Sequence, residues 1–89
     1  MRAIVTVVGH DRVGIIAAVS TLLAECSVNI LDISQTVLEE FFTMVMLVDS
    51  AAYAGSFADL AERLEAQGKE IGMSIRIQRE DIFEAMHRI

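Results

Sequence analysis

The spacing of hydrophobic residues predicts a strand followed by a helix in the first part of the chain. Residues 3–8 form a continuous, mostly β-branched run that ends at Gly9, which is typical of a buried strand. Hydrophobic residues then recur three or four positions apart, which predicts a helix from about Arg12 to Cys26 with Asp11 as its N-cap. The apolar stripe of this helix comprises Ile15, Ile16, Val19, Leu22, Leu23 and Cys26.

Two strands joined by a tight turn are predicted in the middle of the chain. After an exit turn at 27–29, residues 30–38 and 41–48 have the composition of strands. Glu39 and Glu40 join them, although a two-residue hairpin favours Asn-Gly or Asp-Gly because both central positions take positive φ. We therefore expect either a longer loop or one strained glutamate.

A second helix, a last strand and a terminal helix are predicted after the hairpin. Ser56 and Asp59 have the spacing of a capping box, and Gly68 is a natural helix stop. Residues 73–78 alternate between hydrophobic and polar, which indicates a half-exposed strand. The segment 80–89 has the spacing of a short last helix. The expected apolar positions are Phe57, Leu60, Ala61 and Leu64 of the second helix and Ile82, Phe83, Met86 and Ile89 of the last.

The order βαββαβ predicts an α+β, ferredoxin-like fold for residues 1–89 as a single domain. Its four-stranded antiparallel sheet would carry two helices on one face, followed by a short C-terminal helix. The strand at 41–48 has hydrophobic residues on both faces, whereas a sheet face in water is normally polar. We expect the terminal helix, a second subunit or both to cover the face without helices. A homo-oligomer, first of all a dimer, is therefore expected.

Composition narrows the class of protein. The 89 residues carry a net charge of −6, and the seven Lys and Arg residues are scattered, so we expect no nucleic-acid partner. No run reaches the roughly 18 apolar residues of a membrane span, and the N-terminus lacks a signal-peptide pattern. A lone cysteine, Cys26, cannot form an internal disulfide. These features favour a cytoplasmic location and no membrane partner.

The stretch GHDRVG contains the first half of a phosphate-loop pattern, since Gly9 and Gly14 have four residues between them. Ile15 and Ile16 stand where such a loop requires Lys and Ser or Thr, so a nucleotide site is not supported. A helix start still offers free amides to a carboxylate, and Asp11 can receive an ammonium group. Together they suit a free amino acid. The alternative is that Asp11 caps the helix and Gly14 lets it pack on the sheet.

No residue pattern supports catalysis or a metal site. His10, His87 and Cys26 lack the spacing of metal ligands. No serine or cysteine is joined to a base by a local motif. We expect no enzyme activity, no cofactor and no metal.

The segment from Gly9 to Thr36 resembles the opening of the ACT domain, through G-x-D-x-x-G-I at the first helix and Asn29-Ile30 after it. It is similar to the ACT domains of the glycine cleavage system transcriptional repressor and of formyltetrahydrofolate deformylase. The resemblance implies the fold above and a ligand held between subunits, where the first loop of one domain faces the second strand of its neighbour. The implied ligand-binding residues are Asp11, Val13, Gly14, Ile15, Asn29, Ile30 and Asp32.

Two functions follow from the sequence. The first is a homo-oligomeric regulatory domain that senses a small amino acid, with glycine or serine as the first ligands to test. The second is a ligand-free interaction module that pairs with a metabolic enzyme or regulator, through its edge strand or its terminal helix.

Overall fold

The computed structural model describes residues 1–81, and its elements follow the predicted βαββαβ order. The predicted C-terminal helix lies outside the described residues. The bounds of the elements are β1 (Arg2–His10), α1 (Ile15–Glu25), β2 (Asn29–Leu38), β3 (Phe41–Asp49), α2 (Phe57–Ile71) and β4 (Met73–Arg79).

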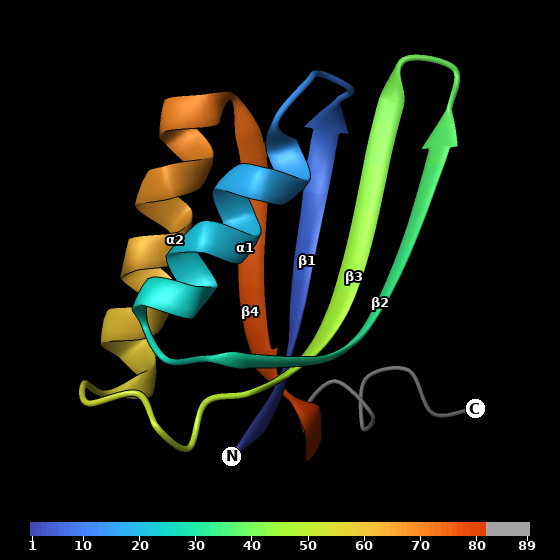
Figure 1. Cartoon of the computed structure of the whole chain (residues 1–89). Coiled ribbons are helices and arrows are strands. Elements are labelled where there is room, and N and C mark those ends of the chain that lie inside the picture. Colours follow the sequence, from blue (N-terminus) through green and yellow to red (C-terminus); the bar gives the residue numbers. More distant parts are fainter. Residues whose placement is uncertain (82–89) are drawn as a thin grey trace.

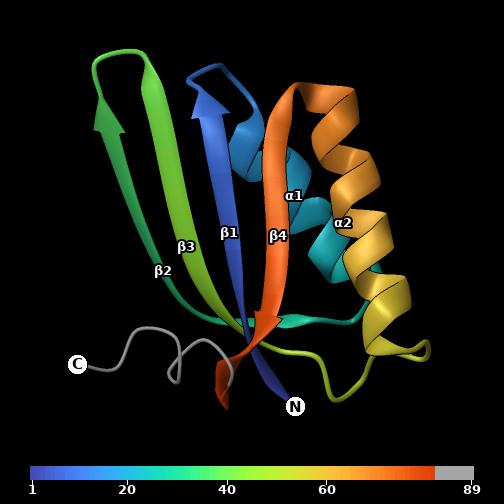
Figure 2. The same cartoon turned by 180° about the vertical axis from the view of Figure 1, so that it is seen from behind.

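The sheet has the strand order β2-β3-β1-β4, and every neighbouring pair is antiparallel. Both helices lie on one face, and β1 and β3 occupy the centre of the sheet (Figure 1). From behind, the four strands lie in front of both helices (Figure 2). The predicted ferredoxin-like fold with an antiparallel sheet and two helices is confirmed.

The core lies between the helices and the sheet. Alternate residues of β3 point toward the helices, from Phe42 to Val48, and are buried there. On the opposite face Phe41 is 48% exposed and Val45 is partly exposed. Since no helix among residues 1–81 covers that face, the expected terminal or subunit cover stays a prediction.

The hairpin between β2 and β3 has a two-residue turn, Glu39 and Glu40, rather than a longer loop. Glu39 takes a left-handed conformation with φ 57°. One strained glutamate was the second of the two alternatives, and it is confirmed. In the turn after α1, Ser27 takes the positive φ of 59°, while Asn29 is already the first residue of β2.

Helix α1 begins three residues later than predicted, and the assignment of Asp11 as its N-cap was wrong. The N-cap is Gly14, which takes a left-handed conformation, and no side chain caps the helix. The Asp11 amide donates instead to the carbonyl of Glu40 at 2.7 Å, so Asp11 stays with the sheet. The apolar stripe is narrower than expected, because Ile16 is 41% exposed.

Helix α2 begins where predicted and ends later. The Ser56 hydroxyl accepts from the Asp59 amide at 3.0 Å, which confirms the predicted cap. The predicted stop at Gly68 was wrong, because the helix continues to Ile71 and is capped by Gly72. Gly68 serves a close approach of β4 instead, since an added Cβ would lie 2.6 Å from the carbonyl oxygen of Met73.

Candidate functional site

The loop between β1 and α1, residues 11–14, lies at the end of the sheet that also holds the β2–β3 hairpin (Figure 1). Its Asp11 amide is hydrogen-bonded to the hairpin carbonyl of Glu40 at 2.7 Å. Its Arg12 Nη1 donates to the carbonyl of Ile71 at 2.8 Å, at the end of α2. Between these anchors and the helix, Val13 is fully exposed, at 101%.

The start of α1 is open. The first intrahelical bond runs from the Ala18 amide to the Gly14 carbonyl at 2.9 Å, so the amides of residues 15–17 precede the helical ladder. Gly14 has φ 92°, and an added Cβ would meet nothing within 4 Å. The conformation therefore requires glycine here, and the alternative that Gly14 permits close packing on the sheet is not supported. These amides carry a partial positive charge that suits an anion.

A groove of about 380 Å³ runs from this helix start to the inner side of β2. The two charged residues of the loop lie beside hydrophobic side chains and the Gln35 amide. Such a groove has a place for a carboxylate at the helix start and for an ammonium group at Asp11. The lining residues are Asp11, Arg12, Gly14, Ile15, Ile16, Ala17, Gln35, Val37 and Phe42.

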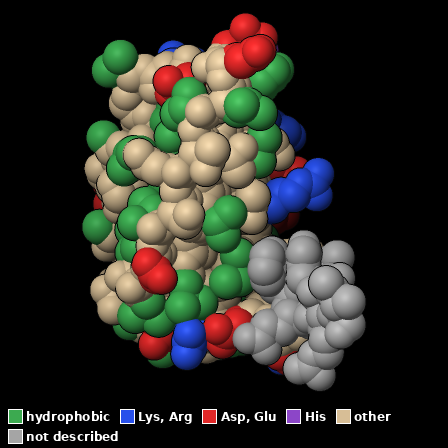
Figure 3. Space-filling model, turned by 90° about the vertical axis from the view of Figure 1, so that its right-hand side faces the viewer, with side chains coloured by type: hydrophobic (Ala, Val, Ile, Leu, Met, Phe, Trp, Pro, Cys, Tyr) green, Lys and Arg blue, Asp and Glu red, His purple; other side chains and the backbone are tan. Residues whose placement is uncertain are grey.

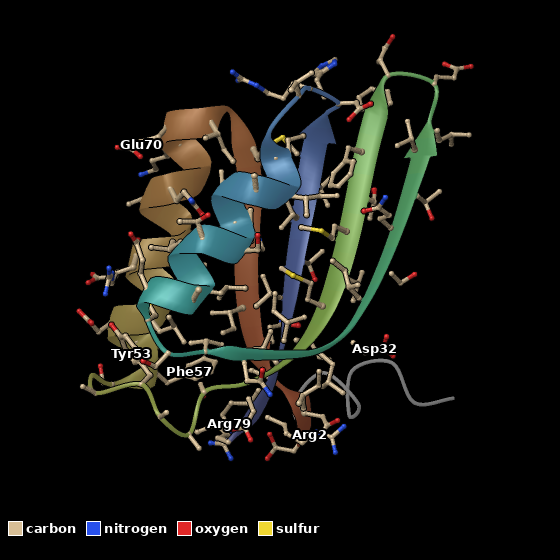
Figure 4. All side chains as sticks on the ribbon, viewed as in Figure 1. Arg2, Asp32, Tyr53, Phe57, Glu70 and Arg79 are labelled. Atoms are coloured by element: carbon tan, nitrogen blue, oxygen red, sulfur yellow. The ribbon has the colours of Figure 1, made fainter. Side chains whose placement is uncertain are left out.

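The strand residues implied by the resemblance lie far from the loop in the same chain. Asn29 pairs with Asp49 at one end of the sheet, and the hairpin that holds Asp11 is at the other end. The ten residues of β2 span about 30 Å between these ends. Figure 4 shows Asp32 on the lower part of β2, away from the loop. One chain therefore does not bring the two halves of the predicted site together.

The side chains of these strand residues also divide between the two faces. Ile30 pairs with the buried Val48, so it points toward the helices and packs against the core. Asp32 follows a register shift and pairs with Leu47 on the other face, where its Oδ1 accepts from the amide of Ile33 at 2.8 Å.

Strand β2 is a free edge of the sheet. Among residues 1–81 it pairs with β3 alone, and all of its residues except the partly buried Ile30 are exposed. Leu31, Ile33 and Val37 are 46%, 44% and 49% exposed. Hydrophobic side chains are visible on the surface that this edge presents (Figure 3). Long apolar edges in proteins are normally covered or paired, so the backbone of this edge is open to pairing with a further strand.

Sequence reasoning missed Gln35 and Val37, which line the groove. Both pair with buried residues of β3, Met44 and Phe42, so they share the helix side of the sheet. The period of two along the strand would have placed them on the same face as Ile33. Sequence reasoning also missed Arg12, which lines the groove and binds the end of α2.

Other clusters of polar groups lie away from this groove. Tyr53 donates to the Asp59 carboxylate, which raises the pKa of Tyr53 and fixes the loop before α2. A groove of about 650 Å³ separates the outer surfaces of the two helices. Within residues 1–81 no three His, Cys, Asp or Glu side chains are grouped as metal ligands. No described helix has the length and apolarity to span a membrane.

Known proteins are similar to this chain in sequence and in fold. The family model of the ACT domain matches residues 2–78. A UPF0237 protein of Clostridium acetobutylicum is 53% identical, over 100% of both chains. An ACT domain protein from Streptococcus pneumoniae is 49% identical and superposes with a TM-score of 0.84 over 98% of each chain.

Two longer proteins confirm the resemblances that the sequence suggested. A formyltetrahydrofolate deformylase from Pseudomonas syringae is 26% identical, with a TM-score of 0.79 over 88% of this chain and 27% of its own. A protein assigned as a glycine cleavage system transcriptional repressor is 24% identical, with a TM-score of 0.74 over 86% of this chain and 44% of its own. The second likeness concerns the fold alone.

Proposed function

Because the chain belongs to the ACT domain family of regulatory amino-acid-binding modules, we propose that it senses a small amino acid at a site shared by two copies. Glycine and serine are the first ligands to test. The observation that carries the proposal is the uncapped start of α1, which opens into a groove between the helix and the free edge of β2.

Antiparallel pairing of two β2 edges about a two-fold axis would complete the site. Such pairing places the start of one β2 beside the end of the other, where the groove lies. The partner's Ile30, which points to the helix side, would then close the groove. We assign Asn29 and Asp32 to the edge contact itself, since Asp32 points to the opposite face.

Each end of the ligand has a candidate partner within the groove. The ligand carboxylate would lie at the amides of residues 15–17, and its ammonium group would lie at the Asp11 carboxylate. Gly14 has no side chain, and that of Val13 is fully exposed to solvent, so neither residue blocks the entrance to the groove. The small ligand limits the affinity, because even the best tiny ligands gain about 1.5 kcal/mol per heavy atom. Binding between micromolar and millimolar is therefore expected, which suits the sensing of a metabolite pool.

A thermal-shift screen of the full chain against the twenty amino acids tests this proposal. A ligand at ten times its Kd stabilises by about 1.4 kcal/mol, which raises the Tm of a domain of this size by roughly 6 °C or more. A selective shift with one or two amino acids is expected. A flat screen on a well-folded dimer would refute the sensor function.

Ile16→Asp is the sharpest variant for this screen. Ile16 is in the first turn of α1 and is 41% exposed, so an acid there stabilises the helix while it repels a ligand carboxylate. We expect the ligand shift to disappear while the protein stays folded. Thr21→Asp, an exposed position further along α1, is the matched control and should keep the shift. Gly14→Val is less informative, because φ 92° strains any other residue.

The second candidate function is a ligand-free interaction module. It is favoured by the β2 edge, which can pair with another chain whether or not a ligand is present. In that case the partner would be a metabolic enzyme or regulator, and the thermal-shift screen would be flat.

A further inference from the structure

We infer that Arg12 is the positioning residue of the β1–α1 loop, residues 11–14, because its side chain binds the end of α2. That the loop binds a ligand rests on the proposed function, whereas the contact between Arg12 and Ile71 does not. Arg12 Nη1 donates to the carbonyl oxygen of Ile71 at 2.8 Å, across 59 positions of sequence. The β1–α1 loop and the turn from α2 to β4 lie at the same end of the molecule in both views (Figures 1 and 2).

The contact is chemically favourable at this place. Ile71 is the last residue of α2, and the final carbonyls of a helix have no intrahelical donor. A cation at a helix C-terminus also interacts well with the helix dipole. The guanidinium lies against the capping turn, since a Cβ on Gly72 would be 3.8 Å from Arg12 Nη1.

Little else fixes the loop. Its first residue is held to the hairpin through the Asp11 amide, and its tip, Val13, is fully exposed. Gly14 has no neighbour within 4 Å of an added Cβ. In the described part of the chain, the bond from Arg12 is therefore the second anchor of the loop. It sets the direction in which the Asp11 carboxylate is presented, while the buried Ile15 holds the start of α1 on the core.

An alternative role for Arg12 is direct pairing with a ligand carboxylate. Nη1 is engaged at the end of α2, and the guanidinium keeps further donors, so the two roles have to be separated by experiment. The two roles differ in the protein without ligand. A positioning residue changes the loop there, whereas a direct ligand contact leaves the loop unchanged until the ligand binds.

Amide hydrogen exchange of the full chain without ligand tests the anchor directly. In Arg12→Met, we expect the Asp11 amide, which is protected by its hydrogen bond to the Glu40 carbonyl, to exchange about fivefold faster, as the loss of one hydrogen bond to a charged group allows. Residues 3–8 of β1 should be unchanged. Arg12→Lys keeps the charge and a donor and should restore exchange to within twofold. Arg79→Met is the matched control, because Arg79 bonds an exposed carboxylate, that of Asp81, outside the loop.

Titration with glycine and serine connects the anchor to binding. We expect Arg12→Met to weaken Kd about fivefold and Arg12→Lys to restore it, while Arg79→Met has no effect. Unchanged loop exchange in Arg12→Met would overturn the inference, whatever happens to binding. Faster exchange in a protein that binds no amino acid would refute the sensor function and leave the anchor intact.

Discussion

Replacing Ile33 by lysine tests whether the β2 edge joins two copies. Ile33 lies near the middle of β2, on the helix side, opposite the buried Met46 of β3. Near a two-fold axis this position faces its own copy. The substitution therefore removes a hydrophobic contact and places two like charges together across the interface.

The magnitude follows from the exposure of the side chain. Full burial of an isoleucine is worth about 1.5–3 kcal/mol, and Ile33 is 44% exposed in the single chain. Pairing can thus recover roughly 1 kcal/mol per chain, or about 2 kcal/mol per dimer. That difference alone weakens the dimer roughly thirtyfold, and the repulsion between the two lysines weakens it further.

Sedimentation velocity over a range of protein concentrations measures the effect. Ser74→Lys, an exposed position on the other edge strand, is the matched control and should leave the dimer constant unchanged. Thermal unfolding of both variants separates association from folding, because Ile33 contributes little to the core of one chain. The reasoning is refuted if the wild type is a monomer at tens of micromolar, or if Ile33→Lys changes the dimer constant by less than threefold.

Three further predictions concern stability. Gly68→Ala should lower the unfolding free energy in urea by about 1–2 kcal/mol despite better helix propensity, because a β4 carbonyl oxygen lies 2.6 Å from the new Cβ; an unchanged midpoint would contradict the close approach. Ser56→Ala should cost about 1 kcal/mol and lower the Tm by roughly 4–8 °C, whereas Ser56→Asp should keep the cap and most of the stability. A hydrogen bond from the backbone amide of Ala51 and, second in importance, one from the N-terminal ammonium group lower the pKa of Asp49 below its usual 3.8. A lowered carboxyl pKa contributes stability above the unfolded pKa and loses it as the pH falls through the folded value. Asp49→Asn should therefore have a lower Tm than the wild type at pH 7, and the difference in Tm should narrow below about pH 3.8. A difference in Tm that is constant with pH would contradict the lowered pKa of Asp49.

The element order could be predicted from the sequence because burial imposes it locally. The alternation of β4 and the helical spacing of α2 each report one buried face, and the structure has those faces. The start of α1 could not be predicted in the same way. Asp11 is a good N-cap by type, but a tertiary bond from its amide to Glu40 holds it on the sheet and leaves Gly14 to turn the chain.

The loop side of the candidate site was named from the sequence, while its surroundings were not. Gln35 and Val37 line the groove because β2 passes next to the start of α1, which depends on the tertiary arrangement. The bond from Arg12 to Ile71 joins residues 59 positions apart, and no local pattern marks such a pair. Conversely, the stop at Gly68 failed because a glycine in a helix can serve a neighbouring strand as well as a turn.

In the proposed function, the separation of the two halves of the site would make ligand binding and self-association a single coupled equilibrium. The start of β2 lies about 30 Å from the loop in the same chain, so the proposed site takes it from a second copy. A ligand held by both copies must strengthen the dimer by the factor by which dimerisation strengthens ligand binding. Ile33→Lys should then lose ligand affinity at protein concentrations where it is monomeric and recover it when concentrated. Arg12→Met should lose affinity at every concentration, because its defect lies within one chain.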